Sequence, residues 1–318
     1  MSKLIRKFFL LLLFLPTALY AGQFDKVYVF GDSLSDSGNL ASVVGPFPQP
    51  PYYQNRVSNG LLAVEVMANR LGLTLEPSLH LIGPAQGTNY SVVAARANSN
   101  EPKDLATQVA LFLANHGGVA PENALYVMFI GGNDVRYARD NPSPIAAYQS
   151  LTDAAVVIAD QIQVLSMAGA RNWLVINAPD IGNIPETRLI AQALGLPGLI
   201  NHATALSLYF NNELKARVNQ VKEDMDIEVE RFDLLKKFNK IADKSLKLGF
   251  SNNTDPCFST NLGQYTPGCN FGLNIDEYVF FDEIHPTARI HAIIGEMLYR
   301  KVADEDAEKE KEKEQEQD

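Results

Sequence analysis

Apolar residues along this chain form short unbroken runs that alternate with longer stretches of helical spacing. The apolar or β-rich runs, which we predict as strands, cover residues 26–30, 89–93, 124–130, 173–177 and 278–281. Apolar residues three or four positions apart predict helices over residues 61–71, 104–115, 144–168, 203–221, 234–248 and 289–302. Apolar strands that alternate with helices are typical of an α/β protein with a buried parallel sheet. Functional residues in such a protein lie at the carboxyl ends of the strands.

The two ends of the chain differ from the body between them. Residues 1–21 begin with basic residues and continue as the apolar run FFLLLLFLPTALY, which is the pattern of a secretory signal peptide. A membrane anchor is the alternative, but a bilayer span needs about 20 apolar residues, and this run is shorter and contains Pro16. We therefore expect an exported protein, periplasmic or extracellular, with a body over residues 22–303. Residues 304–318 form an acidic low-complexity tail that is either disordered or an extension of the last helix.

Length and composition fit one ordinary globular domain or two small ones. The chain has 318 residues, of which 46% are hydrophobic, and this excludes disorder over the whole length. It carries 27 Lys and Arg against 37 Asp and Glu, a net charge of -10 at pH 7, so a general basic surface for nucleic acid is excluded. Two cysteines are too few for a cysteine-based zinc cluster or a disulfide-dense scaffold.

Cys257 and Cys269 flank a stretch rich in Gly, Pro, Asn and Thr, which is typical of a surface loop. In an oxidising compartment we expect the two to form a disulfide, which would stabilise the fold by about 3 kcal/mol; two free buried thiols are the alternative. Such loops are favoured sites of proteolysis, and this one precedes the last predicted strand. We therefore expect a lid that an activating protease opens, with a purely structural staple as the alternative.

The first polar cluster, GDSLSDSGN, begins at Gly31 directly after the run 26–30. Glycine permits a tight turn off a strand, which would present the Ser33 hydroxyl at the sheet edge, where it could attack a carbonyl. The alternative is that Ser33 is a turn or helix N-cap residue, as serines in such clusters usually are.

The second cluster, DEIHP, follows the run 278–281 directly. A serine nucleophile needs a base, and the base needs an acceptor on its other ring nitrogen. Asp282 and His285, three positions apart on a turn, can face the same way and supply both groups. The alternatives are that His285 caps the next helix or that the pair binds a metal, although no third ligand is evident.

The third cluster, GGND, follows the run 124–130 and places Asn133 two residues after Gly131. An asparagine amide at this point could donate a hydrogen bond to a developing oxyanion. A plain strand-to-helix turn is the alternative.

Taken together, FGDSLSDSGN, GGND and DEIHPT resemble the GDSL esterases, also called SGNH hydrolases, in order and spacing, over about residues 27–302. The resemblance implies an α/β fold, a three-layer α/β/α sandwich with a mostly parallel central sheet and a single catalytic domain. It implies that Ser33 is the nucleophile, His285 the base and Asp282 the residue that orients the base. The oxyanion would be held by the Ser33 amide, the Asn133 side chain and one further amide. No metal or organic cofactor is implied.

The further amide is where this sequence departs from the family pattern, which is close to G-x-N-F-A-x-G-G-A. The matching stretch begins at Gly87, and Ala94 stands at the position of the last glycine. Alanine keeps the backbone N–H, so the oxyanion hole can survive the change. If the backbone there needs a positive φ, however, alanine is strained.

Within the family, the two end motifs and a Cys-closed loop before Asp282 most resemble the secreted bacterial phospholipases, lysophospholipases and glycerophospholipid–cholesterol acyltransferases. This implies a serine esterase whose partner is a lipid substrate, a lysophospholipid or phospholipid met at a membrane or micelle. Water, or another hydroxyl such as that of a sterol, would accept the acyl group. The alternatives are a carbohydrate O-acetyl esterase or arylesterase, which would lack an apolar trough for a long acyl chain, and a non-catalytic surface-binding protein.

Two other features have open interpretations. The segment PFPQPPYY over residues 46–53 has little room for regular structure, so its aromatic residues line an acyl pocket or form a plain surface loop. The histidines outside the motifs are interpreted as surface or capping residues; they are His80, His116, His202 and His291.

Overall fold

A parallel four-stranded sheet forms the centre of the protein, in a computed structural model that describes residues 24–315. Its strands are β1 (Lys26–Gly31), β2 (Ala124–Phe129), β3 (Asn172–Ile176) and β4 (Glu228–Phe232). They lie in the sheet in the order in which they occur in the chain, and each neighbouring pair is parallel. Every residue of β2 is buried, which explains why its sequence is apolar without interruption.

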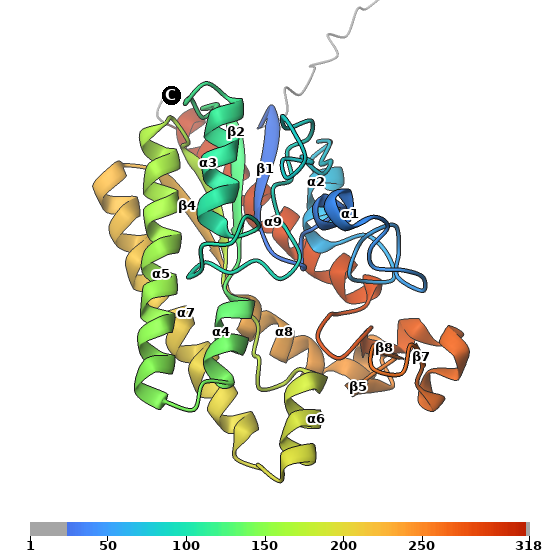
Figure 1. Cartoon of the computed structure of the whole chain (residues 1–318). Helices are drawn as coiled ribbons and strands as arrows, with labels where there is room; N and C mark the ends of the chain where they lie inside the picture. Colours follow the sequence, from blue (N-terminus) through green and yellow to red (C-terminus); the bar gives the residue numbers. More distant parts are fainter. Residues whose placement is uncertain (1–23, 316–318) are drawn as a thin grey trace, which may run out of the picture.

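Helices cover both faces of this sheet (Figure 1). The longer helices are α2 (Ala63–Arg70), α3 (Leu105–Asn115), α5 (Pro144–Met167), α7 (Leu199–Met225) and α9 (Ala288–Gln315). On one face α5 packs against both α3 and α7, and on the other face α2 packs against α9. The expected three-layer α/β/α arrangement with a parallel central sheet is therefore confirmed.

A short helix follows each strand of the central sheet in turn. These helices are α1 (Asn39–Val44), α4 (Gly132–Arg139), α6 (Pro185–Leu194) and α8 (Leu234–Asp243). The carboxyl ends of the strands point toward the end of the molecule where α4, α6 and α8 lie (Figure 1). Two of the three polar clusters, those that contain Ser33 and Asn133, therefore meet at this edge of the sheet.

Two expectations about the strands were wrong, and one strand was missed. Residues 89–93 form no full strand: Asn89 makes single bridges to Val29 and Pro77, and the segment runs beside β1 without a regular ladder. Residues 278–281 do not join the central sheet, because β8 (Tyr278–Phe280) pairs with β5 (Asn252–Pro256) in a separate two-stranded sheet. The strand β4 was not predicted, since three of the five residues in its sequence EVERF are charged and it lacks an unbroken apolar run.

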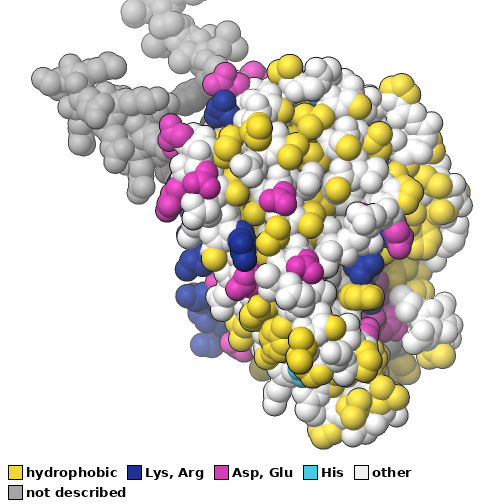
Figure 2. Space-filling model, turned by 60° about the vertical axis from the view of Figure 1, so that its left-hand side comes forward, with side chains coloured by type: hydrophobic (Ala, Val, Ile, Leu, Met, Phe, Trp, Pro, Cys, Tyr) yellow, Lys and Arg dark blue, Asp and Glu magenta, His cyan; other side chains and the backbone are white. Residues whose placement is uncertain are grey.

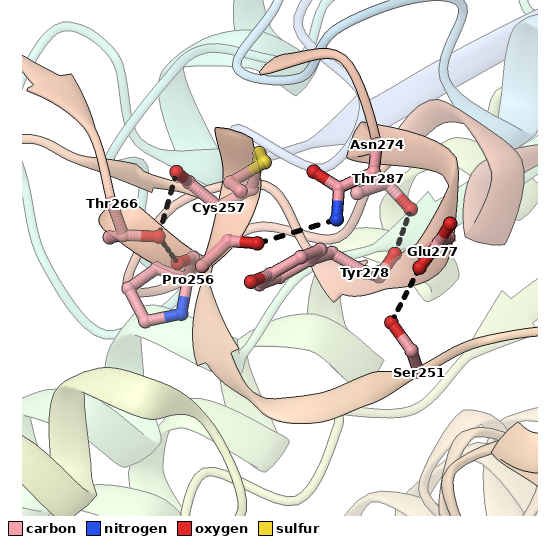
Figure 3. The surroundings of a disulfide bond; sticks show 10 residues. Ser251, Pro256, Cys257, Thr266, Asn274, Glu277, Tyr278 and Thr287 are labelled. Atoms are coloured by element: carbon pink, nitrogen blue, oxygen red, sulfur yellow. Dashed lines mark hydrogen bonds between the residues drawn. A yellow bond between two sulfur atoms is a disulfide. The ribbon is translucent and has the colours of Figure 1, made fainter. Parts of the chain in front are cut away.

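The segment before Asp282 is closed by a disulfide between Cys257 and Cys269, as expected. It contains the antiparallel pair β6 (Phe258–Ser259) and β7 (Gln264–Tyr265), and the 3₁₀ helices of the surrounding region are η1 (Ser245–Leu248), η2 (Pro267–Gly272) and η3 (Ile275–Glu277). The Thr266 hydroxyl donates to the carbonyls of Pro256 and Cys257, as Figure 3 shows. Tyr278 packs against the disulfide, and its carbonyl accepts a hydrogen bond from the Thr287 hydroxyl.

The structure describes most of the C-terminal segment and none of the expected signal peptide. The signal peptide expected over residues 1–21 lies outside the described residues. At the other end, α9 continues into the acidic segment as far as Gln315. Over residues 24–315 there is no helix with the length and apolar character that a bilayer crossing requires.

Charged side chains of both signs are interspersed over the face of the molecule drawn in Figure 2. Hydrophobic side chains gather at the lower end of that face, at the height where Figure 1 places α6. Leu189, Leu194 and Leu196, in α6 and just after it, are all exposed. The end of the molecule toward which the strands point is thus also rich in exposed apolar residues.

Candidate active site

Ser33 lies in a tight turn that begins where β1 ends. The amides of Ser35 and Asp36 both donate to the carbonyl of Asp32, at 3.1 and 3.0 Å, and this closes the turn around Ser33. A glycine is required just before it, because a Cβ on Gly31 would lie 2.5 Å from the carbonyl oxygen of Phe129 in β2. The side chain of Ser33 is thereby held at the carboxyl edge of the sheet, as the sequence predicted.

The Asp36 carboxylate organises the rest of this loop. Its Oδ1 accepts hydrogen bonds from the amides of Gly38 and Asn39, each at 2.7 Å. Its Oδ2 accepts from the amides of Leu40 at 3.1 Å and of Val93 at 2.9 Å. One buried carboxylate therefore joins the Ser33 loop to the segment that carries Ala94, so that the two keep a fixed relative position.

Ser33, His285 and Asp282 form a continuous chain of hydrogen bonds. The Oγ of Ser33 lies 2.8 Å from Nε2 of His285, and Nδ1 of the same ring lies 2.9 Å from each oxygen of Asp282. All three residues are buried. The structure thus brings together three residues that the sequence places 252 positions apart at the widest, in the order hydroxyl, imidazole and carboxylate. This is the arrangement that a serine nucleophile, its base and an orienting carboxylate require.

The Asp282 carboxylate has more partners than the imidazole. Its Oδ1 accepts from the amides of Ile284 at 2.8 Å and His285 at 2.7 Å, and its Oδ2 accepts from the Tyr52 hydroxyl at 2.7 Å. Burial alone would raise the pKa of Asp282, but the nearby His285 and these hydrogen bonds outweigh it and lower the pKa below its ordinary value. Asp282 is therefore ionised wherever His285 is needed as a base.

Two backbone amides have the properties expected of oxyanion donors. Among the residues that the structure describes, the amides of Ser33 and Ala94 donate no hydrogen bond to another group of the protein. Ala94 has a φ of 62°, so the backbone at this position is left-handed, which is the geometry that glycine favours. The departure from the family pattern therefore places a strained alanine in the loop while its N–H is kept. Ala94 itself does not line the pocket described below.

The side-chain amide of Asn133 is held in one orientation. Its Nδ2 donates to the Ala95 carbonyl at 3.0 Å, and its Oδ1 accepts from Nη1 of Arg136 at 3.0 Å. Arg136 is anchored in turn by Glu186 in α6, which also accepts from Arg139. Burial would raise the pKa of Glu186, but the two arginines outweigh it and lower the pKa. The sequence indicated Asn133 and gave no sign of the ion pairs that orient it.

A pocket lies beside Ser33, and its lining is mostly apolar. The polar residues at its wall include Ser33, Asn133, Arg136 and His285. The remaining wall is built largely of aliphatic and aromatic side chains: Leu34, Ala63, Phe129, Pro179, Ile181, Ile184, Leu234, Phe238, Phe280, Ile284, Pro286 and Ile294. No residue of the segment 46–53 or of the loop 257–269 is among them, so neither segment forms this wall.

Sequence reasoning misplaced two histidines. His80 and His291, which we expected at the surface or as caps, are buried. His291 lines the pocket; its Nδ1 accepts from the Ala63 amide at 3.1 Å, and burial followed by the positive potential of His285 lowers its pKa to about 3. A helical signal was present, because His291 is three and seven positions from Ile294 and Leu298 and so lies on the same buried face of α9.

Asp32, next to the serine, also lines the pocket and is buried. Burial raises its pKa to about 6, and the hydrogen bond from the Leu34 amide and the nearby His285 only partly oppose that rise. A carboxyl group that changes charge near neutral pH is thus part of the wall beside Ser33.

The chain matches the family model described as GDSL-like lipase/acylhydrolase over residues 27–298. It belongs to this family. It is 25% identical to a phosphatidylcholine-sterol acyltransferase of Aeromonas hydrophila, in an alignment that covers 86% of this chain and 88% of that protein. It is 34% identical to lipase 1 of Photorhabdus luminescens over 52% of this chain, and here it spans only 24% of the relative's length. A solved carbohydrate acetylesterase, Est24 of Sinorhizobium meliloti, aligns at 17% identity with a TM-score of 0.43, covering 87% of this chain and 98% of the other.

The family is described as one of GDSL-like lipases and acylhydrolases. The residues of the three polar clusters lie within the matched range. What the family alone leaves open is the identity of the acyl group and of the group from which it is cleaved.

Proposed function

We propose that this protein is a secreted serine esterase that hydrolyses the acyl ester bonds of lipids, with lysophospholipids or phospholipids as substrates. The observation that carries this proposal is the pocket that begins at Ser33 and continues between apolar side chains such as Ile181, Leu234 and Phe238. Burial of each methylene group of a fatty acyl chain in such a pocket contributes about 0.8 kcal/mol. The apolar lining favours a hydrocarbon chain over a polar sugar, and because the open space is only about 50 Å³, the pocket must widen to admit a long chain. The carbohydrate O-acetyl esterase and arylesterase alternatives are therefore decided by the substrate comparison below.

In the proposed mechanism, Ser33 Oγ attacks the ester carbonyl while Nε2 of His285 takes its proton. Asp282 keeps the imidazole in the tautomer that presents an unprotonated Nε2 and stabilises the imidazolium that forms. The tetrahedral oxyanion is held by the amides of Ser33 and Ala94 and by the side chain of Asn133, each donor of this kind being worth about 2.7–4 kcal/mol. His285 then gives its proton to the leaving alcohol, and water clears the acyl-enzyme. A sterol or another hydroxyl in place of water would give an acyl transfer.

Contact with a membrane or micelle is the second part of the proposal. Its support is the exposed apolar set on and after α6, of which Leu194 is 65% exposed. The pocket residues Ile181 and Ile184 directly precede the same helix, so the apolar surface and the apolar pocket adjoin in the chain. A lipid chain could leave its aggregate and enter the pocket at this end of the molecule.

The first experiment is a substitution of the nucleophile. Ser33→Ala should reduce ester hydrolysis to less than a few per cent of the wild-type rate. It should leave the melting temperature nearly unchanged, since among residues 24–315 the lost hydroxyl bonds only to His285. A fluorophosphonate probe should label the wild type at Ser33 and leave the variant unlabelled. A wild-type protein that resists the probe would revive the alternative of a non-catalytic surface-binding protein.

The second experiment identifies the substrate. Fatty acid release from lysophosphatidylcholine, release from diacyl phosphatidylcholine, and acetate release from an acetylated sugar should be measured in parallel with the same enzyme preparation. The proposal expects the lysophospholipid or the phospholipid to be hydrolysed at the highest kcat/KM. A preference for the acetylated sugar would contradict the proposal.

Secretion and proteolytic activation remain proposals from the sequence. The support for secretion is the pattern of residues 1–21, and mass spectrometry of the mature N-terminus from culture supernatant tests it. The support for an activating protease is the composition of the Cys257–Cys269 loop, whereas the contacts of the loop favour the alternative of a structural staple. Its test is given with the loop's contacts in the Discussion.

A further inference from the structure

Tyr52 reaches Asp282 from a part of the chain that contributes nothing else to the Ser33–His285–Asp282 chain of hydrogen bonds. It lies in the proline-rich segment between α1 and α2, 230 positions from Asp282 in sequence, and its hydroxyl donates to Oδ2 of Asp282 at 2.7 Å. The ring is half-buried and meets the rings of Phe281 and Phe258 edge to face, at 5.0 and 5.7 Å between centroids. Both ends of the side chain are therefore fixed.

The hydrogen bonds on the two oxygens of Asp282 show what Tyr52 does. Oδ1 accepts from two backbone amides as well as facing the imidazole. Oδ2 faces the imidazole and accepts from one other group, which is Tyr52. Without the tyrosine, Oδ2 would have the imidazole alone as its partner, and the carboxylate could turn relative to the ring of His285.

On this geometry we propose that Tyr52 is a positioning residue for ester hydrolysis: it holds the Asp282 carboxylate in the plane in which it orients His285, and the disulfide-closed loop holds Tyr52 in place. This inference rests on the proposed function of the Ser33 site. Burial, followed by the charge of Asp282 and the hydrogen bond to it, raises the pKa of Tyr52 far above its ordinary value. Its hydroxyl is therefore a donor at every pH at which the enzyme would work.

The loop closed by Cys257 and Cys269 forms the support behind the tyrosine. Its first residues are bonded to the strand and turn that lead to Asp282: the Phe258 amide donates to the Phe281 carbonyl at 2.7 Å. Thr260 donates from its amide and its hydroxyl to the carboxylate of Glu283. The ring of Phe258 lies against Tyr52 and stacks on Phe281 at 6.1 Å. The loop thus holds both the aromatic rings that contact Tyr52 and Glu283, the residue that follows Asp282.

The test compares Tyr52→Phe with Tyr53→Phe. The first variant removes only the hydroxyl and keeps the ring contacts; the second removes the hydroxyl of the exposed neighbour, whose ring faces Arg56. A hydrogen bond to a charged group corresponds to roughly a tenfold to hundredfold effect. For a short soluble p-nitrophenyl ester, we expect Tyr52→Phe to lose kcat by about tenfold with KM changed less than about twofold, and Tyr53→Phe to match the wild type.

The pH profile supplies a readout that a merely structural role would leave unchanged. The titratable groups that act on His285 are Asp282, Asp32 and His291, and Glu283 acts on Tyr52. When the Tyr52 donor is removed, more of the negative charge of Asp282 faces His285, and the imidazolium is stabilised. The acid limb of kcat/KM should therefore move to higher pH in Tyr52→Phe and stay in place in Tyr53→Phe. An unmoved limb together with wild-type kcat in Tyr52→Phe would overturn the proposal.

The support by the loop is tested with a double-mutant cycle. Phe258→Ala should lower kcat in the wild type and have little further effect in Tyr52→Phe, because both act through Asp282. Effects that multiply independently would contradict the coupling. Fluorophosphonate labelling distinguishes a failure of the proposed function from a failure of the role of Tyr52. A wild type that is not labelled at Ser33 refutes the proposed function. A labelled wild type with an unaffected Tyr52→Phe variant refutes only the role of Tyr52.

Discussion

Nη1 of Arg136 donates to Oδ1 of Asn133 at 3.0 Å, and this contact determines which way the asparagine amide faces. An arginine has only donors, so the amide oxygen must lie on its side, and the Nδ2 group is left on the other side. That group keeps one hydrogen for the Ala95 carbonyl and has a second for a substrate oxygen. The asparagine is therefore prepared as a donor before any substrate binds, which is what makes such a group effective in catalysis.

Replacement of Arg136 should accordingly weaken catalysis through Asn133. Asn133→Ala should lower kcat by about a hundredfold to a thousandfold, as is usual for one oxyanion donor. Arg136→Gln should lower kcat less, by about threefold to tenfold, because Asn133 keeps its bond to Ala95. In the Asn133→Ala background Arg136→Gln should have almost no effect on kcat. A full effect there would mean that Arg136 acts by another route, such as its ion pair with Glu186.

Ala94 gives a prediction about stability. At its φ of 62° an alanine costs about 1–2 kcal/mol, whereas a glycine adopts this conformation freely. The greater flexibility of glycine in the unfolded chain offsets about 0.4–1 kcal/mol of that gain. Ala94→Gly should therefore raise the free energy of unfolding by about 0.5–1 kcal/mol, measured by urea denaturation. The control is the exposed Ala114 in α3, where Ala114→Gly should lower it by a similar amount. A loss of stability at both positions would show that Ala94 is not strained.

The residues that sequence could reveal and those that it could not differ in the range of their interactions. Ser33, Asn133 and the pair Asp282–His285 each follow a strand directly, so local pattern indicated them. Tyr52 follows no strand and lies in no motif, so nothing local marked it, and its partner Asp282, 230 positions away, is near it only in the folded chain. The same holds for the apolar pocket wall, to which helices and loops from six or more segments contribute.

The strands of the central sheet also differ in how clearly the sequence indicated them. Strands buried on both faces, such as β2, appear in the sequence as unbroken apolar runs and were predicted. The strand β4 has a neighbour in the sheet on one side only, and only Val229 and Phe232 of its five residues are buried. Charged residues are acceptable at such an edge, and Glu230 forms an ion pair there with Lys301 of α9. The edge strand therefore had no apolar run by which to be recognised.

Asp32 predicts a dependence of stability on pH. Its pKa is raised from 3.8 to about 6 in the folded protein, so the folded state binds this proton more tightly than the unfolded chain does. The contribution of Asp32 to the free energy of unfolding consequently falls as the pH rises from about 4 to about 6. In Asp32→Asn this loss is absent. The free energy of unfolding of the variant should therefore rise relative to that of the wild type as the pH increases from about 4, and the relative gain should reach about 3 kcal/mol by pH 7.

Asp134 is the comparison for this prediction, because its pKa is also raised to about 6 by burial. Its two oxygens accept from the amides of Ala97 and Asn98, each at 2.9 Å, and an asparagine can accept only one of these bonds. The difference in the free energy of unfolding between Asp134→Asn and the wild type should change with pH as it does for Asp32→Asn. At every pH, however, Asp134→Asn should be less stable than Asp32→Asn. Denaturation curves between pH 4 and pH 8 measure both variants. A difference between Asp32→Asn and the wild type that does not change with pH would contradict the assignment.

The Cys257–Cys269 loop gives the last prediction, and its contacts decide the direction. It does not line the pocket; its hydrogen bonds go to Phe281 and Glu283, on either side of Asp282. Cleavage between Phe258 and Gly268 should therefore loosen the turn that carries Asp282, instead of uncovering Ser33. We expect a cut in this loop to lower the hydrolysis of lysophosphatidylcholine micelles and of a soluble p-nitrophenyl ester by the same factor, with a lower melting temperature.

The measurement is the ratio of the two rates before and after limited proteolysis, with the cut located by mass spectrometry under non-reducing conditions. Ser33→Ala, cut in the same way, gives the background rate for both substrates. Equal losses support the loop as a structural staple for Asp282. A rise in the micellar rate alone would instead support a lid and an activating protease, because only a barrier to a bulky lipid would leave the small ester unaffected when it is removed.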